Sequence, residues 1–97
     1  EQLIHNREEV NIMTFEGALI REQGVEFAII IVKPFVLNSN IQANQFRNQC
    51  SHMFPGVPII LMAQDSRGIP TYQGRTDIVK FLSKVHPNRI PWKKYTI

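Results

Sequence analysis

Two short runs of consecutive apolar residues stand out along the chain, at 27–32 and 57–62. Runs of this length, rich in β-branched side chains, are typical of strands that are buried on both faces of a sheet. A β-forming segment at 10–15 predicts a further strand. Residues 69–73 follow a polar turn at 64–68 and predict a fourth strand, paired with its predecessor as a hairpin.

Three segments between and after these strands predict helices. Residues 16–23 contain good helix formers and precede Gly24, a residue suited to end a helix. In the second segment, apolar residues recur every three or four positions behind N-cap candidates at 38–40, as one face of a helix requires. That stripe consists of Ala43, Phe46, Cys50 and Met53. The third segment, 76–85, is amphipathic, with Thr76 as its expected N-cap.

The resulting order of elements is β-α-β-α-β-β-α. Because βαβ links favour parallel pairing through right-handed crossovers and a tight turn demands antiparallel pairing, this order predicts a mixed sheet. We therefore expect an α/β fold with a four-stranded sheet flanked by three helices. The strands at 27–32 and 57–62 should be central neighbours, with 69–73 antiparallel beside the second.

Length and composition limit the classes of protein to which this chain can belong. The 97 residues are enough for one hydrophobic core, so we expect a single domain over 1–97, with an N-terminal extension at 1–9 and a basic aromatic tail at 87–97. The apolar runs are far too short to cross a bilayer, so no membrane partner is expected. The single cysteine, Cys50, cannot form an internal disulfide, which favours a reducing, cytoplasmic location.

The formal net charge of +3 is unevenly distributed, since acidic residues concentrate in 1–26 and basic residues in 27–97. Within the tail, Arg89 to Tyr95 interleaves bases with aromatics, a pattern that suits stacking on single-stranded nucleic acid. The same pattern fits a tail that packs Trp92 over the core while its lysines stay in water, and we favour this second interpretation.

Two short motifs resemble those of glutaredoxins, within the thioredoxin-like superfamily. Val57-Pro58 at the start of a buried strand resembles the family's cis-proline pair, and Gly74-Arg75-Thr76-Asp77 resembles the step at the start of its last helix. The resemblance implies a thioredoxin-like fold and a cis bond before Pro58. It further implies a groove for a thiol peptide of the glutathione type.

The ligand-binding residues that the resemblance implies are Val57, Pro58, Gly74, Thr76 and Asp77. In glutaredoxins the residue before the cis-proline presents backbone groups to the peptide, while the helix step holds its carboxylate and amine. The physical reading agrees, because free N–H groups at a helix N-terminus attract a carboxylate and an adjacent Asp can receive an ammonium. Thr76 and Asp77 acting only as helix caps is the competing interpretation.

The chain departs from the family where the catalytic Cys-x-x-Cys would stand, because residues 13–17 read Met-Thr-Phe-Glu-Gly. Without a nucleophilic sulfur at that helix N-terminus, ordinary glutaredoxin catalysis is not expected, and no residue is assigned as catalytic. Cys50 belongs to the apolar stripe, which favours a buried, unreactive thiol. The three histidines lie at no recognisable ligand spacing, so no metal or other cofactor is predicted.

Three functional hypotheses follow. The first is a non-catalytic thioredoxin-like domain that binds a peptide or protein partner, through the groove beside Val57-Pro58 or through a sheet edge. The second is a divergent thiol-handling protein that binds glutathione-like ligands and uses Cys50 or a partner's thiol. The third is a nucleic-acid-binding accessory protein that acts through its basic C-terminal region. The sequence leaves the partner and the oligomeric state open.

Overall fold

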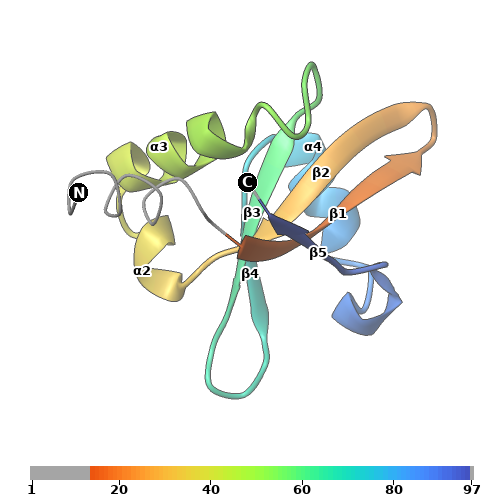
Figure 1. The fold of residues 1–97 in the computed structure, drawn as a ribbon. Helices are drawn as coiled ribbons and strands as arrows, with labels where there is room; N and C mark the ends of the chain where they lie inside the picture. The colour runs from red at the N-terminus through yellow and green to blue at the C-terminus, as the bar shows by residue number, and fades with distance from the viewer. Residues whose placement is uncertain (1–13, 97) are drawn as a thin grey trace.

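The computed structural model describes residues 14–96, which form a mixed five-stranded sheet with helices on both faces (Figure 1). The strand order across the sheet is β4-β3-β2-β1-β5. The strands are β1 (Thr14–Glu22), β2 (Val25–Ile31), β3 (Ile59–Gln64), β4 (Pro70–Gln73) and β5 (Lys93–Thr96). The helices are α2 (Pro34–Leu37), α3 (Asn40–Cys50), α4 (Thr76–Leu82) and the 3-10 turn η1 (Pro87–Arg89).

The α/β class and the mixed sheet agree with the sequence prediction, and two of the three predicted helices correspond to α3 and α4, whereas α2 was not predicted. The central strands also agree, since β2 runs parallel to β3 with Ala28 opposite Ile59, and β3 runs antiparallel to β4 with Leu61 opposite Gln73. Ser39 caps α3, accepting a hydrogen bond from the Gln42 backbone N–H at 3.3 Å. The apolar runs and the helical stripe therefore predicted these elements correctly.

The predicted helix at 16–23 is wrong, because these residues are most of strand β1. Gln23 and Gly24 both have positive φ and close a two-residue turn, so β1 folds straight back onto β2 as an antiparallel hairpin. Pairing with β2, whose central residues are buried, overrides the weak helical preference of this segment. The strand predicted at 10–15 lies outside the described residues except for Thr14 and Phe15, which begin β1.

The sheet has five strands rather than the four predicted, because part of the expected tail joins it. After η1, β5 pairs antiparallel with the first half of β1, from Thr14 opposite Thr96 to Gly17 opposite Lys93. The preferred interpretation of the tail is confirmed: Trp92 packs against the core while Lys93 and Lys94 are exposed. Sequence patterning missed this strand because it is short and mostly polar, as edge strands often are.

Side chains of β2 alternate between two hydrophobic clusters, one on each face of the sheet. Ala28 and Ile30 pack on the face that carries α2 and α3, whereas Phe27 and Ile29 pack on the face that carries α4. Gly17 is required where β1 crosses this centre, since a Cβ there would lie 2.7 Å from the Ile29 carbonyl oxygen. No helix in the described part of the chain is long and apolar enough to span a membrane.

Candidate functional site

The Val57-Pro58 pair precedes β3, at the end of the loop that follows α3. The bond before Pro58 is trans, because the described residues contain no cis peptide bond, so the prediction of a cis-proline is wrong. A trans bond suits the local pairing: the Pro58 carbonyl oxygen accepts a hydrogen bond from the Ala28 N–H at 2.9 Å and extends the β2–β3 ladder. The specific backbone feature behind the glutaredoxin resemblance is therefore missing.

Gly74 lies close to this pair because β3 and β4 are antiparallel. A Cβ on Gly74 would lie 3.4 Å from the Ile59 carbonyl oxygen and 2.5 Å from Ile60 Cδ1. The structure thus brings Gly74 next to the start of β3, as the resemblance implied. The approach is so close that a side chain at position 74 would collide with Ile60.

Thr76 and Asp77 start α4, but neither has the predicted arrangement. The N-cap position is Arg75, without a side-chain cap hydrogen bond, and Thr76 is the first helical residue. Both Asp77 carboxylate oxygens accept hydrogen bonds from Arg75, at 2.7 Å from Nε and 2.8 Å from Nη2. This contact lowers the pKa of Asp77 to about 2. The exposed carboxylate thus has a cationic partner within the chain, and its role toward a ligand amine stays a prediction.

Arg47 of α3 lies beside the start of β3 and the end of β4. Its Nε donates to the Ile59 carbonyl oxygen at 3.0 Å, and its Nη2 donates to the Gln73 carbonyl oxygen at 2.7 Å. Burial lowers the pKa of this guanidinium. The side chain therefore ties α3 to both strands beside the place where the groove was predicted. Sequence reasoning missed Arg47 because only the apolar stripe of α3 was considered.

Cys50 is fully buried at the end of α3, so its predicted burial is confirmed. Ala43, from the same stripe, and Phe54 belong to the same apolar cluster, whereas Met53 is exposed. Desolvation raises the pKa of the thiol to about 11, which keeps it protonated at neutral pH. Among residues 14–96, no group of three His, Cys, Asp or Glu side chains is placed to hold a metal ion.

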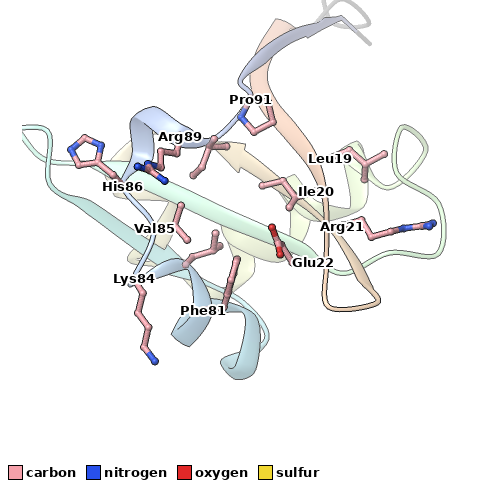
Figure 2. A pocket seen from close by; sticks show the side chains of 12 residues that line it. Leu19, Ile20, Arg21, Glu22, Phe81, Lys84, Val85, His86, Arg89 and Pro91 are labelled. Atoms are coloured by element: carbon pink, nitrogen blue, oxygen red, sulfur yellow. The ribbon is translucent and has the colours of Figure 1, made fainter.

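A different part of the molecule offers an open site. A hollow of about 630 Å³ lies between the second half of β1 and the segment that follows α4 (Figure 2). Ile20, Phe81 and Val85 face one another across it, and Leu82 and Ile90 complete its apolar wall. Its remaining lining residues are Leu19, Arg21, Glu22, Lys84, His86, Arg89 and Pro91.

One wall of this hollow is an uncovered stretch of sheet edge. The pairing of β5 with β1 stops at Gly17, so no strand of the described chain covers the outer side of residues 18–22. The chain turns away here because Pro91 has no N–H to continue the ladder, and the Trp92 N–H bonds instead to the Ile90 carbonyl oxygen at 2.8 Å. The open edge therefore begins where β5 ends.

The hairpin geometry fixes which backbone groups point outward from this edge. Glu22 and Val25 flank the two-residue turn and form a hydrogen-bonded pair, so alternate residues of β1 bond to β2. Leu19 and Arg21 occupy the intervening positions. Their N–H and C=O groups consequently point away from β2, toward the hollow. The edge thus presents donors and acceptors in the alternation that another strand would match.

Basic side chains surround the hollow. Arg21, Lys84 and Arg89 contribute three cations to its lining, against one carboxylate from Glu22. Arg21 and Lys84 extend outward on different sides of the hollow in Figure 2. The hollow therefore combines an apolar floor with a positively charged rim. Sequence reasoning missed it because β1 was predicted as a helix and the tail was not placed beside it; Gly24 was the only local signal of the hairpin.

No family model matches this chain, and no curated protein or solved structure matches it either. The thioredoxin-like assignment accordingly stays a prediction.

Proposed function

We propose that this protein is a non-catalytic domain that binds an extended segment of a partner protein along the open edge of β1. The observation that carries the proposal is the uncovered backbone of residues 18–22 beside an apolar hollow. Adding a strand to a free sheet edge is a general mode of peptide recognition, in which main-chain hydrogen bonds give affinity and side-chain pockets give specificity. Both components are present here.

The other free edges of the sheet are less suited to this role. Strand β4 is only four residues long and starts with Pro70, which cannot donate a ladder hydrogen bond. Strand β5 carries Lys93 and Lys94, and lysines on edge strands discourage pairing with another chain. Within residues 18–22, in contrast, the apolar Leu19 is 47% exposed. This segment is the place where an added strand would bury apolar surface.

Simple energetics support binding at this place. Each main-chain hydrogen bond in the added ladder contributes about 1 kcal/mol net. One apolar side chain that enters the hollow adds about 1.5–3 kcal/mol. A short ladder with one anchoring side chain therefore leaves only a modest surplus over the entropy lost on association, which corresponds to reversible binding of a segment rather than permanent assembly.

The thiol-handling and nucleic-acid hypotheses have less support. Cys50 is buried with a raised pKa, and the bond before Pro58 is trans. Trp92, the aromatic residue best suited to stack on a base, is half-buried, and its indole N–H donates to the Pro87 carbonyl oxygen at 3.0 Å. No specific observation favours either of these functions over peptide binding.

Selection from a displayed library of random peptides tests the proposal. Peptides that bind the wild-type protein should lose binding to Leu19→Pro, because this change removes an outward N–H and blocks the edge without removing a bond to β2. Leu19→Ala, which keeps the N–H, is the matched control and should weaken binding far less than Leu19→Pro, because it removes only side-chain contact. In the complex, the amide protons of Leu19 and Arg21 should become protected from solvent exchange. A library that yields no binders, or binders indifferent to Leu19→Pro, would overturn the proposal.

A further inference from the structure

The rim of the hollow carries charge that the strand-binding proposal alone does not require. Within residues 14–96 the ion pairs are Arg75 with Asp77 and Arg21 with Glu26. The second is loose, with 3.9 Å between Arg21 Nη2 and Glu26 Oε2 and both side chains largely exposed. Arg21 therefore remains free to contact a ligand. Lys84 and Arg89 form no ion pair with any other described residue.

We propose that the segment bound at β1 is acidic, an inference that rests on the proposed function. A strand added beside β1 alternates its side chains between the two faces of the sheet. Side chains on one face enter the hollow, where Ile20, Phe81 and Val85 accept an apolar group and the rim offers Lys84 and Arg89. Side chains on the other face lie beside Leu19 and Arg21. The preferred ligand is thus an extended peptide with one apolar anchor flanked by Asp or Glu.

The same charges argue against a second copy of this chain as the occupant. A symmetric pair of β1 edges is isologous, so each copy brings Arg21, Lys84 and Arg89 to the same interface. Like charges that meet across an interface disfavour association. An acidic segment of a different protein neutralises these cations, whereas another copy doubles them.

The backbone argues against nucleic acid at this edge. Leu19 and Arg21 present carbonyl oxygens as well as N–H groups, and each carbonyl requires a donor. A peptide strand supplies donors and acceptors in alternation. Phosphate oxygens only accept hydrogen bonds, so the phosphates of single-stranded DNA would satisfy the cations and leave the outward carbonyls to water. A peptide fits both sets of groups.

The test uses the full chain and sequences the peptides selected on it. Binders that depend on an intact β1 edge should be enriched in Asp and Glu on both sides of an apolar residue. A representative peptide should bind at least about fivefold more weakly after Arg21→Glu or Arg89→Glu. Lys33→Glu, which reverses an exposed charge outside the hollow, is the control and should change affinity less than twofold, a small fraction of that effect.

The outcomes separate this inference from the proposed function. Edge-dependent binders that are neutral or basic would overturn the acidic ligand while leaving strand addition in place. The absence of any edge-dependent binder would overturn both. Displacement of the peptide by single-stranded DNA of equal charge would contradict a peptide-specific edge. Self-association of the protein that is lost in Leu19→Pro would identify a second copy as the occupant and also overturn the inference.

Discussion

On one face of the sheet, the 11-residue helix α3 joins a dry core around Phe15, Cys50 and Phe54. On the opposite face, α4 is 7 residues long and leaves the second half of β1 beside a hollow. The two faces share the same strands, so the difference arises from the covering elements. The longer helix encloses the apolar cluster on one face, whereas the shorter helix leaves a hollow beside the second half of β1 on the other.

The aromatic contacts of the two faces show the same contrast. Phe15, Phe54 and Tyr95 form a cluster in which ring centroids lie between 5.1 and 6.4 Å apart, and Tyr95 thereby attaches β5 to this face. On the α4 face, Phe27 meets only Phe81 among the aromatic pairs of the described chain, at 6.5 Å. Phe81 is half-buried because it also lines the hollow.

Truncating one phenylalanine on each face gives the largest expected effect. Phe54→Ala should lower the free energy of unfolding by about 3–5 kcal/mol, because it empties a fully enclosed site between two rings. Phe81→Ala should cost clearly less, about 1–2 kcal/mol, since its ring is already partly in water. Urea denaturation with linear extrapolation measures both. Equal losses would show that the α4 face is as tightly packed as the α3 face.

Two arginines provide the next comparison. Arg47→Met should lower the free energy of unfolding by about 1–3 kcal/mol, because the carbonyl oxygens of Ile59 and Gln73 lose a charged donor in a part-buried place. Arg75→Met removes an exposed ion pair and should lower the free energy of unfolding far less than Arg47→Met does. A larger effect for Arg75 would reverse our view of which arginine stabilises the β3–β4 hairpin.

The reactivity of the Cys50 thiol measures how well the core on the α3 face excludes solvent and reagents. A small thiol reagent at neutral pH should label it only when the protein unfolds, since the thiol is enclosed and its pKa is about 11. Cys50→Ala should cost of order 1 kcal/mol, and Cys50→Ser more, because a hydroxyl would be buried without a partner. Native-state labelling followed by mass spectrometry checks the first part. Rapid labelling together with a fully stable Cys50→Ser variant would favour the thiol-handling hypothesis instead.

The smallest effect concerns Asp77 at the start of α4. Its pKa is lowered from 3.8 to about 2 by the Arg75 hydrogen bonds, so the carboxylate stabilises the fold above its unfolded pKa. That stabilisation should disappear as the pH falls from about 4 through about 2. We expect a slightly lower melting temperature for Asp77→Asn at neutral pH and no difference from wild type below about pH 2. A difference that persists in acid would indicate a role other than the ionised carboxylate.

The elements that could be predicted from the sequence are those whose side chains carry the core. The runs that became β2 and β3 are buried in the centre of the sheet, and the α3 stripe of Ala43, Phe46 and Cys50 faces the core. The apolar pattern of these segments is therefore visible in the sequence. Strand β1 could not be recognised in this way. Its helix-forming residues adopt the strand because β2 lies beside them, which is a tertiary effect.

The candidate site was unpredictable for a related reason. The proximity of Gly74 to the start of β3 follows from a hairpin and was expected. The hydrogen bonds of Arg47 to the carbonyl oxygens of Ile59 and Gln73 were not, because they depend on how α3 packs beside the two strands. The hollow is assembled from β1 and from residues after α4, which the sequence pattern placed in a helix and a tail. No local motif marks such a site, because it consists of an edge that another strand fails to cover.

The pairing of Thr14 with Thr96 has a consequence for how the chain folds. The β1–β2 and β3–β4 hairpins form between neighbours in sequence, whereas β5 must find β1 across nearly the whole described chain, at a much greater loss of loop entropy. We therefore expect β5 to dock late. Until it does, the exposed edge runs along the entire length of β1, and partly folded molecules can associate there before the lysines of β5 close half of it.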